Sequence, residues 1–279
     1  MIDKYHNFNE SNNFLFSMRF QLILEADTPA IIGLNYQYPL SAAIYRIIQQ
    51  ADEVYANFLH NTGYTSGSKL FKLFTFSNLN TPFEIKGDRM ICISNRVALF
   101  VCFHMPEAAA HFIKGIFMHQ QITIADSRSK ACFMIKEVQL LPLPQLDAAS
   151  SIWFVPASPL VTGLKNNRGH YDYMSPLDQG YENNIRNNLV EKWNSIHPLS
   201  NEEKQALLEA IQIKTAYYAT PPRHRLITLK QNTPGETKIR GYEKFKIHIN
   251  APAGMIELAM NAGLGIYNAM GMGCIQLLE

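Results

Sequence analysis

The chain ends in two Gly-x-Gly pairs, Gly263-Leu264-Gly265-Ile266-Tyr267-Asn268-Ala269-Met270-Gly271-Met272-Gly273, followed by the strand-like Cys274-Ile275-Gln276-Leu277-Leu278-Glu279. Glycine permits positive φ angles and lets another backbone approach closely. Successive backbone N–H groups in such a loop can form a concave site for an anion. The segment therefore predicts either a purely structural turn before a last strand or, as we favour, a loop that binds phosphate groups.

Two familiar phosphate-binding loops do not fit this segment. A Walker-type P-loop requires Gly-Lys-Ser/Thr after its spacer, and the segment has none. A dinucleotide-binding fingerprint would place its third glycine at position 268, where the chain has Asn268. It would also need most of a βαβ unit afterwards, and only residues 269–279 remain. A nucleotide cofactor is therefore not expected, and no other cofactor is indicated.

The composition indicates a well-packed globular protein. The chain has 279 residues, of which 47% are hydrophobic and 17% charged, enough for one large domain or two of ordinary size. The formal net charge of +2 is too small to indicate nucleic-acid binding by itself, so the local distribution of charge has to be considered.

Targeting and redox signals are few. The four cysteines lie far apart without a Cys-x-x-Cys pair, which indicates neither a zinc site nor a disulfide framework. A reducing cytoplasm is the expected location, and no metal site is expected. Residues 1–17 are rich in Asn and lack the apolar core of a signal peptide, so we expect a loose tail. No stretch has the length of a transmembrane helix, and no membrane partner is expected.

The spacing of apolar residues indicates two similar halves joined by the proline-containing segment 141–145. In the first half we expect helices over 40–59 and 106–119, with strands at 18–25, 70–77, 90–94, 98–103, 121–124 and 132–141. In the second we expect helices over 177–194 and 252–260, with strands at 152–161, in the 210s, in the 220s and at 238–249. Each half can be read as βαββαβ, the ferredoxin-like arrangement. The sequence thus predicts an α+β protein with two tandem ferredoxin-like domains, 18–143 and 144–279, the second carrying the C-terminal glycine-rich loop.

One expected strand carries a strong charge signal. Alternation along 238–249 places six polar or aromatic side chains on one face, Lys238, Arg240, Tyr242, Lys244, Lys246 and His248, with apolar residues on the other. Between Arg223 and Asn250 there are seven Lys or Arg but only two acidic residues, Glu236 and Glu243. Because an ordinary solvated strand usually mixes charges of both signs, this pattern favours a surface that binds a polyanion.

With these features in place, the chain resembles the CRISPR-associated repeat-RNA endoribonucleases of the repeat-associated mysterious protein superfamily. The family's Gly-hydrophobic-Gly-x5-Gly-hydrophobic-Gly loop is matched by Gly263, Gly265, Gly271 and Gly273. Its N-terminal signature is similar to four segments, Met18-Arg19-Phe20, residues 35–45, Phe58-Leu59-His60 and residues 72–77. The resemblance implies CRISPR repeat RNA, as precursor and as mature guide, as the partner. It also implies RNA binding by the four glycines, through their backbone N–H groups; to these we add Lys238, Arg240, Lys244 and Lys246 of the basic strand.

The resemblance also implies metal-independent cleavage of precursor CRISPR RNA within each repeat. The ribose 2′-OH attacks the adjacent phosphate, leaving a 2′,3′-cyclic phosphate and a 5′-OH. By motif match the catalytic residues are Tyr45, His60 and Lys72. His60 would be the general acid or base, Lys72 would stabilise the phosphorane, and Tyr45 would orient or deprotonate the 2′-OH. Lys69 is an alternative to Lys72, and the assignment of acid and base to Tyr45 and His60 stays open.

This set of residues makes a geometric demand on the expected helix. Tyr45 and His60 are fifteen residues apart in the sequence, which is about 22 Å along one straight helix and too far for one active site. A shared site therefore requires the helix to break, and Asp52 could cap a second short helix.

Two other functions remain open from the sequence. One is a non-catalytic subunit of the same fold that binds guide RNA; the other is a metabolic enzyme that binds a small phosphorylated ligand at the glycine loop. Subunits of a CRISPR effector complex and a second copy of the chain are further possible partners.

Overall fold

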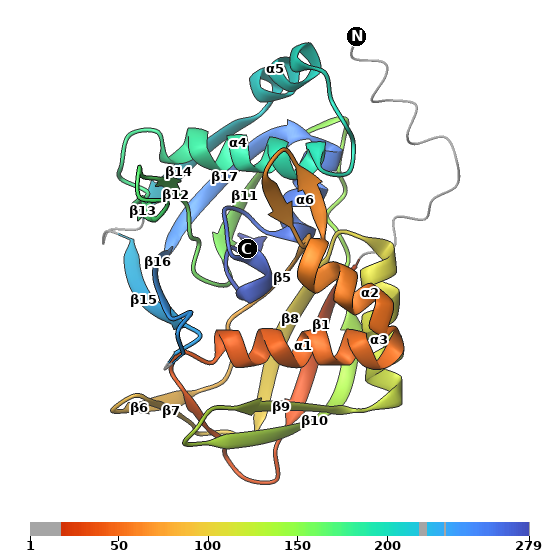
Figure 1. Cartoon of the computed structure of the whole chain (residues 1–279), viewed down its shortest axis with the longest axis vertical. Helices are drawn as coiled ribbons and strands as arrows, with labels where there is room; N and C mark the ends of the chain where they lie inside the picture. Colours follow the sequence, from red (N-terminus) through yellow and green to blue (C-terminus); the bar gives the residue numbers. More distant parts are fainter. Residues whose placement is uncertain (1–17, 218–221, 232, 279) are drawn as a thin grey trace.

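The computed structural model describes residues 18–217, 222–231 and 233–278, so the expected tail over 1–17 lies outside the described residues. The structure is a mixed α/β protein with two large sheets, as the sequence predicts in outline (Figure 1).

The first sheet is formed by the N-terminal half. Its strand order is β5-β8-β1-β10-β9, from Phe74–Phe76, Arg96–Phe103, Arg19–Glu25, Lys130–Leu140 and Gln121–Ala125. Helices α1 (Gln37–Ala51) and α3 (Pro106–Met118) pack together and cover one face (Figure 1). Alternate residues of β1, such as Leu22 and Leu24, are completely buried in the resulting core, as expected for a sheet with one covered face.

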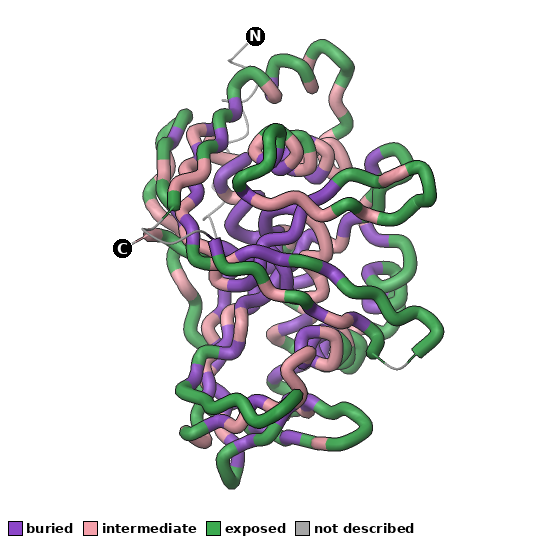
Figure 2. Tube along the Cα trace, turned by 90° about the vertical axis from the view of Figure 1, so that its left-hand side faces the viewer, coloured by how far each residue is buried: buried purple, intermediate pink, exposed green. Residues whose placement is uncertain are grey.

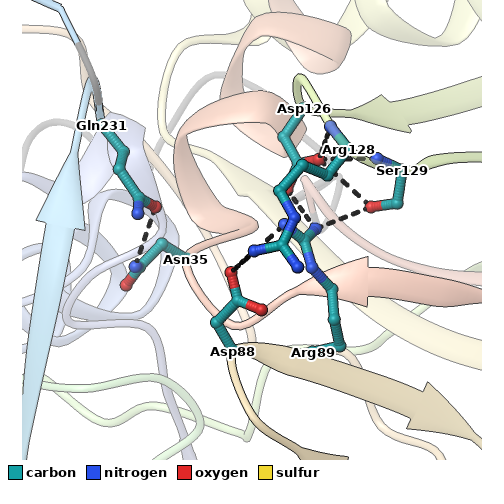
Figure 3. A network of polar contacts seen from close by, with 7 residues as sticks. All are labelled: Asn35, Asp88, Arg89, Asp126, Arg128, Ser129 and Gln231. Atoms are coloured by element: carbon teal, nitrogen blue, oxygen red, sulfur yellow. Dashed lines mark hydrogen bonds and ion pairs between the residues drawn. The ribbon is translucent and has the colours of Figure 1, made fainter.

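Smaller elements surround this sheet. They are the hairpin of β3 (Tyr64–Ser66) and β4 (Lys69–Phe71) and the three-stranded sheet of β2 (Ile31–Gly33), β7 (Arg89–Cys92) and β6 (Phe83–Lys86). Arg89 and Arg128 fix the turn between β6 and β7 to the turn between β9 and β10, through Asp126 and Asp88 (Figure 3).

The second sheet is formed by the C-terminal half. Its strand order is β14-β17-β11-β18, from Gln212–Tyr217, Phe245–Pro252, Ala149–Pro156 and Ile275–Leu277. Helices α4 (Tyr181–Asn194), α5 (Asn201–Ala210) and α6 (Ala253–Ala262) accompany it. Two hairpins extend from this half, β12 (Gly163–Lys165) with β13 (Tyr171–Tyr173) and β15 (Arg223–Leu229) with β16 (Thr237–Glu243).

Two sequence predictions need correction here. The expected basic strand over 238–249 is two strands in different sheets, β16 and β17, because Lys244 adopts φ 59° and turns the chain between them. Tyr242 is consequently buried and does not lie on a solvent-facing basic surface. Helix α5 was not expected, although Ser200 and Glu203 form a capping box that marks its start in the sequence.

The glycine-rich loop between α6 and β18 joins the two halves. It lies beside β5 and α1 (Figure 1), where Thr75 Oγ1 donates to the carbonyl of Met272 at 3.0 Å. The buried side chain of Arg19 in β1 donates to the carbonyls of Met260 and Ile275, at 2.9 Å for the latter. Figure 2 shows the buried residues gathered along the centre of the molecule.

We expect Arg19→Met to lower the free energy of unfolding by about 2–4 kcal/mol, because it removes hydrogen bonds from a charged donor and leaves buried carbonyls unpaired. Chemical denaturation followed by circular dichroism measures this loss. Arg96→Met is the matched control, since Arg96 is exposed on the neighbouring strand β8 and lies 3.9 Å from Glu25. Equal stabilities of the two variants would show that Arg19 does not hold the halves together.

Candidate active site

A break in the first long helix brings the predicted catalytic residues together. Helix α1 ends at Ala51, and Asp52 is extended with φ −157° and ψ 107°. The Asp52 carboxylate accepts a hydrogen bond of 2.8 Å from the backbone N–H of Tyr55 and caps α2 (Glu53–Asn57). A π-helical turn over Phe58–Thr62 follows and carries His60. The expected break at Asp52 is confirmed, and the chain folds back toward α1.

Tyr45 and His60 are neighbours in this arrangement. Their ring centroids lie 5.2 Å apart with the planes at 80°, an edge-to-face contact that aromatic rings favour. Tyr45 also contacts the buried ring of Phe74 at 5.4 Å, which fixes it from the core side. His60 is exposed, so the pair presents a rigid tyrosine below an accessible imidazole.

Lys72 completes the group from the segment between β4 and β5. Its Nζ atom donates to the carbonyl oxygen of His60 at 2.8 Å. Lys69 is exposed on the β3–β4 hairpin, where its backbone pairs with Ser66, and no hydrogen bond joins it to His60 among the described residues. The geometry therefore brings Tyr45, His60 and Lys72 to one place on the surface.

The surroundings set the protonation of two of these groups. Burial raises the pKa of the Tyr45 phenol well above its usual value, so the hydroxyl stays protonated at neutral pH. Partial burial lowers the pKa of Lys72 from its usual value, since desolvation disfavours the ammonium. The Nδ1 atom of His60 lies 3.0 Å from the amide oxygen Oδ1 of Asn61. Because that oxygen only accepts, a hydrogen bond between the two atoms places a proton on Nδ1.

Gly63 makes room for Lys72. Its backbone has φ 62° and ψ −157°, a region that is essentially restricted to glycine. A Cβ atom here would lie 2.5 Å from the carbonyl oxygen of Phe71 and 3.0 Å from Cδ of Lys72. The composition of residues 61–68 predicts a turn here, but only the structure shows that Gly63 makes room for Lys72.

The four glycines of the loop are buried and shape it from within. A Cβ at any of them would lie less than 3.0 Å from another protein atom; at Gly273 that atom is the carbonyl oxygen of Leu264. The N–H of Gly263 donates to Ala259, that of Gly271 to Asn268 and that of Gly273 to Pro159. These three N–H groups are hydrogen-bonded within the protein, and RNA binding by the glycine loop stays a prediction. The partly exposed spacer 266–270 is the part of the loop that faces outward.

Side chains from both halves hold the loop in place. Ser41 of α1 donates to the carbonyl of Ala269 at 2.6 Å, and the Asn268 amide donates to the carbonyls of Leu264 and Met272. The buried ammonium of Lys192 donates to the carbonyl of Gly263 at 2.6 Å. Burial lowers the pKa of Lys192 to about 7.

The predicted basic residues divide between two places. Lys238 and Arg240 are exposed on β16, Lys244 is exposed at the turn, and Lys246 lies half-buried on β17. Arg225 does not face solvent as a free charge: it donates to the carbonyl of Leu34 and lies over the ring of Tyr36 at 5.8 Å. The β15–β16 hairpin is thus tied to the segment before α1. The Asn35 side chain there accepts from the N–H of Thr228 and donates to the side chain of Gln231; Figure 3 shows the contact with Gln231.

Within residues 18–217, 222–231 and 233–278, no cluster of three or more His, Cys, Asp or Glu side chains is arranged to hold a metal ion. No helix in the described part of the chain is both long and apolar enough to cross a membrane.

Comparison with known families identifies the chain's relatives. Residues 31–139 match the model for the N-terminal part of the CRISPR-associated protein Cas6, and residues 142–277 match the model for its C-terminal part. The chain belongs to the Cas6 family. It is 28% identical over 186 residues to the CRISPR-associated endoribonuclease Cas6 1 of Methanocaldococcus jannaschii. The aligned residues cover 65% of this chain and 67% of that protein.

Solved structures share the fold of this Cas6 family member. A Cas6-related protein from Pyrococcus furiosus superposes with a TM-score of 0.74 at 17% sequence identity. A structure described as an RAMP protein binding different RNA substrates superposes with a TM-score of 0.72 at 15% sequence identity. Each similarity covers 94% of this chain and 99% of the other. A Cas6 product complex superposes with a TM-score of 0.61 over 93% of this chain and 98% of the other, at 15% identity.

We expect Gly63→Ala to destabilise the protein by more than Gly67→Ala, measured by chemical denaturation. Both glycines have positive φ, 62° and 58°, so both variants carry backbone strain of about 1–2 kcal/mol. At Gly67, however, nothing lies within 4 Å of an added Cβ, whereas Gly63 meets Phe71 and Lys72. If both variants lost the same free energy of unfolding, Lys72 would not be held against Gly63.

Proposed function

We propose that the chain is a metal-independent endoribonuclease that cuts precursor CRISPR RNA once within each repeat and releases guide RNAs. The observation that carries the proposal is the convergence of Tyr45, His60 and Lys72, which come from three separate segments. The family assignment and the name of the curated relative support the same reaction.

The proposed reaction is a transesterification within the RNA. The 2′-OH loses its proton to a base, its oxygen bonds to the adjacent phosphorus, and the 5′-oxygen leaves as a hydroxyl after it gains a proton. The products are a 2′,3′-cyclic phosphate and a 5′-OH. An imidazole can both donate and accept a proton, and His60 is exposed beside Tyr45, so His60 is the residue to move one of these protons.

Tyr45 and Lys72 have supporting roles in this proposal. Because burial raises the pKa of Tyr45, its phenol is a poor base at neutral pH and is better suited to orient the 2′-OH by hydrogen bonding. The ammonium of Lys72 supplies positive charge where the phosphorane gains negative charge. Its contact with the carbonyl of His60 keeps the charge beside the imidazole.

We further propose that the two sheets are tandem ferredoxin-like domains, divided near residues 143 and 144. The order β14-β17-β11-β18 and the antiparallel pairing of β11 with both neighbours support this for the second half. In the first half β9 is an added edge strand beside β10. RNA would bind across the junction of the domains, along the loop spacer and the exposed cations Lys238, Arg240 and Lys244, with Lys246 as a further contact.

Two partner proposals accompany this function. Association with CRISPR effector subunits would be detected by co-purification of the tagged protein with those subunits from the source organism. A homodimer would be detected by light scattering of the purified chain.

The first test of the function is cleavage of a repeat RNA from the source genome in excess EDTA. We expect wild type to cut once and leave a cyclic phosphate. His60→Ala removes the imidazole that moves a proton, and general acid–base catalysis contributes about 10²–10⁴-fold. We therefore expect His60→Ala to cleave at least 100-fold more slowly than wild type, while its RNA affinity stays within about 2-fold. Both quantities are measured with labelled RNA.

His119→Ala is the control for this measurement, because His119 lies at the end of α3 and belongs to none of the contacts of the site. Cleavage that depends on a divalent ion would contradict metal independence. RNA binding by wild type without any cut would instead favour a non-catalytic guide-RNA-binding subunit.

Lys72 gives a second prediction, on pH dependence. Its ammonium is present below its lowered pKa and is lost as pH rises through that value, so we expect wild-type cleavage to fall on the alkaline side earlier than an ordinary lysine would allow. Lys72→Arg stays charged throughout, and its cleavage rate, although lower near pH 7, should not fall in the same range. Single-turnover rates, corrected for uncatalysed hydrolysis, measure the two profiles; identical alkaline limbs would exclude Lys72 as the titrating group.

A further inference from the structure

Three tyrosines form a cluster on the outward side of the glycine loop. Tyr171 and Tyr173 belong to β13, and Tyr267 belongs to the loop spacer. The rings of Tyr171 and Tyr173 are nearly parallel, with centroids 6.2 Å apart, and Tyr171 meets Tyr267 edge to face at the same distance. The hydroxyls of Tyr173 and Tyr267 are 3.4 Å apart. All three side chains are partly exposed, so they form a preorganised aromatic surface that solvent reaches.

Tyr267 is held in an unfavourable backbone conformation. Its φ of 63° and ψ of 28° lie in the left-handed region, which a bulky residue rarely adopts. The loop is fixed on both sides of it, by Ile266 N–H donating to Val161 and by Asn268 binding two carbonyls. Strain of this kind persists where the surrounding structure imposes it, and it is concentrated at functional sites. The result is that the ring of Tyr267 points toward β13.

The cluster adjoins the candidate active site through helix α1. Tyr38 packs on the same small core as Tyr173 and Tyr267. Tyr38 and Tyr45 are seven residues apart on α1, so they share one face about 10 Å apart along the axis. Ser41, between them, binds the loop at Ala269. A strand of RNA cut beside Tyr45 and His60 therefore reaches the cluster within a few nucleotides.

Cations border the cluster on the β12–β13 hairpin. Lys165 and Arg168 are exposed there, and the one acidic residue of the hairpin, Asp172, accepts a hydrogen bond of 3.1 Å from the side-chain amide of Asn166. The Nζ atom of Lys165 lies 5.7 Å from the centroid of the Tyr171 ring, over the ring itself. An exposed lysine over an aromatic face can move to a phosphate while a base takes its place on the ring.

We propose that Tyr171, Tyr173 and Tyr267, with Lys165 and Arg168, form a base-stacking site for single-stranded nucleotides adjacent to the scissile phosphate. The proposal rests on the proposed function and specifies how the substrate is held beside the glycine loop. Stacking tolerates any base, because every base has an aromatic face, and the bordering cations bind the backbone. Tyr171, the outermost ring of the hairpin, provides the main contact.

The test measures RNA affinity without cleavage. The probe is a fluorescein-labelled repeat RNA from the source genome with a 2′-deoxy nucleotide at the mapped cleavage position, titrated by fluorescence anisotropy. We expect Tyr171→Ala to raise the Kd about 5- to 100-fold, the range that loss of one base–aromatic stack produces. Tyr171→Phe keeps the ring and should stay within about 2-fold of wild type.

Trp153→Ala is the matched control. Trp153 is 39% exposed on β11 and contacts His248 of β17, so it is an accessible aromatic residue outside the β12–β13 hairpin and the loop. The substitution Trp153→Ala should leave the Kd for the RNA unchanged. The stacking site would be overturned if Tyr171→Ala bound the RNA with wild-type affinity. It would also be overturned if Tyr171→Phe lost as much affinity as Tyr171→Ala, or if only Trp153→Ala lost affinity.

A second measurement does not depend on the folding of a variant. With 4-thiouridine placed at single positions next to the cleavage site, irradiation of wild type should cross-link RNA to the peptide that contains Tyr171 or Tyr267. Cross-links only elsewhere would overturn the proposal while leaving cleavage intact. If wild type neither binds nor cuts repeat RNA, it is the proposed function that fails.

Discussion

Close packing of the glycine-rich loop against both halves is the constraint on which the rest of the structure depends. Gly273 lies so close to the backbone of Leu264, and Gly271 to the ring of Phe76, that a side chain at either position would collide with the protein. Phe76 belongs to the first sheet and the loop to the second half, so this contact sets how the halves meet. Arg19 reinforces the same junction by binding carbonyls on either side of the loop.

The candidate active site is a consequence of how the chain leaves its first helix. Asp52 ends α1 and caps α2, and the π-helical turn that follows returns His60 to the ring of Tyr45. Gly63 then lets the chain pass close to Phe71, which brings Lys72 under the carbonyl of His60. Each step is local, yet together they place three residues from separate segments in contact.

Helix α1 contacts both the loop and the candidate site. Ser41 binds the loop spacer, and Tyr45, one turn later, contacts His60. The spacer carries Tyr267 outward to meet the β12–β13 hairpin, so aromatic side chains continue from the site along the helix. The glycines provide the shape of the loop, and the side chains of the spacer provide its outward-facing chemistry.

The sequence by itself determined the alternation of strands and helices, the position of the glycine loop and the family to which the chain belongs. These follow from apolar periodicity, glycine spacing and motif matches. Asp52 was a candidate cap in the sequence, but only the structure decided that the helix breaks there. Only the tertiary structure decided which polar groups are free to bind a partner and which are already bonded within the protein. The N–H groups of Gly263, Gly271 and Gly273 and the side chain of Arg225 are already bonded within the protein. Lys244 turns one expected basic strand into two. The tyrosine cluster was invisible because Tyr171 and Tyr267 are distant in sequence, and side chains from separate segments become neighbours only when long-range packing brings them together.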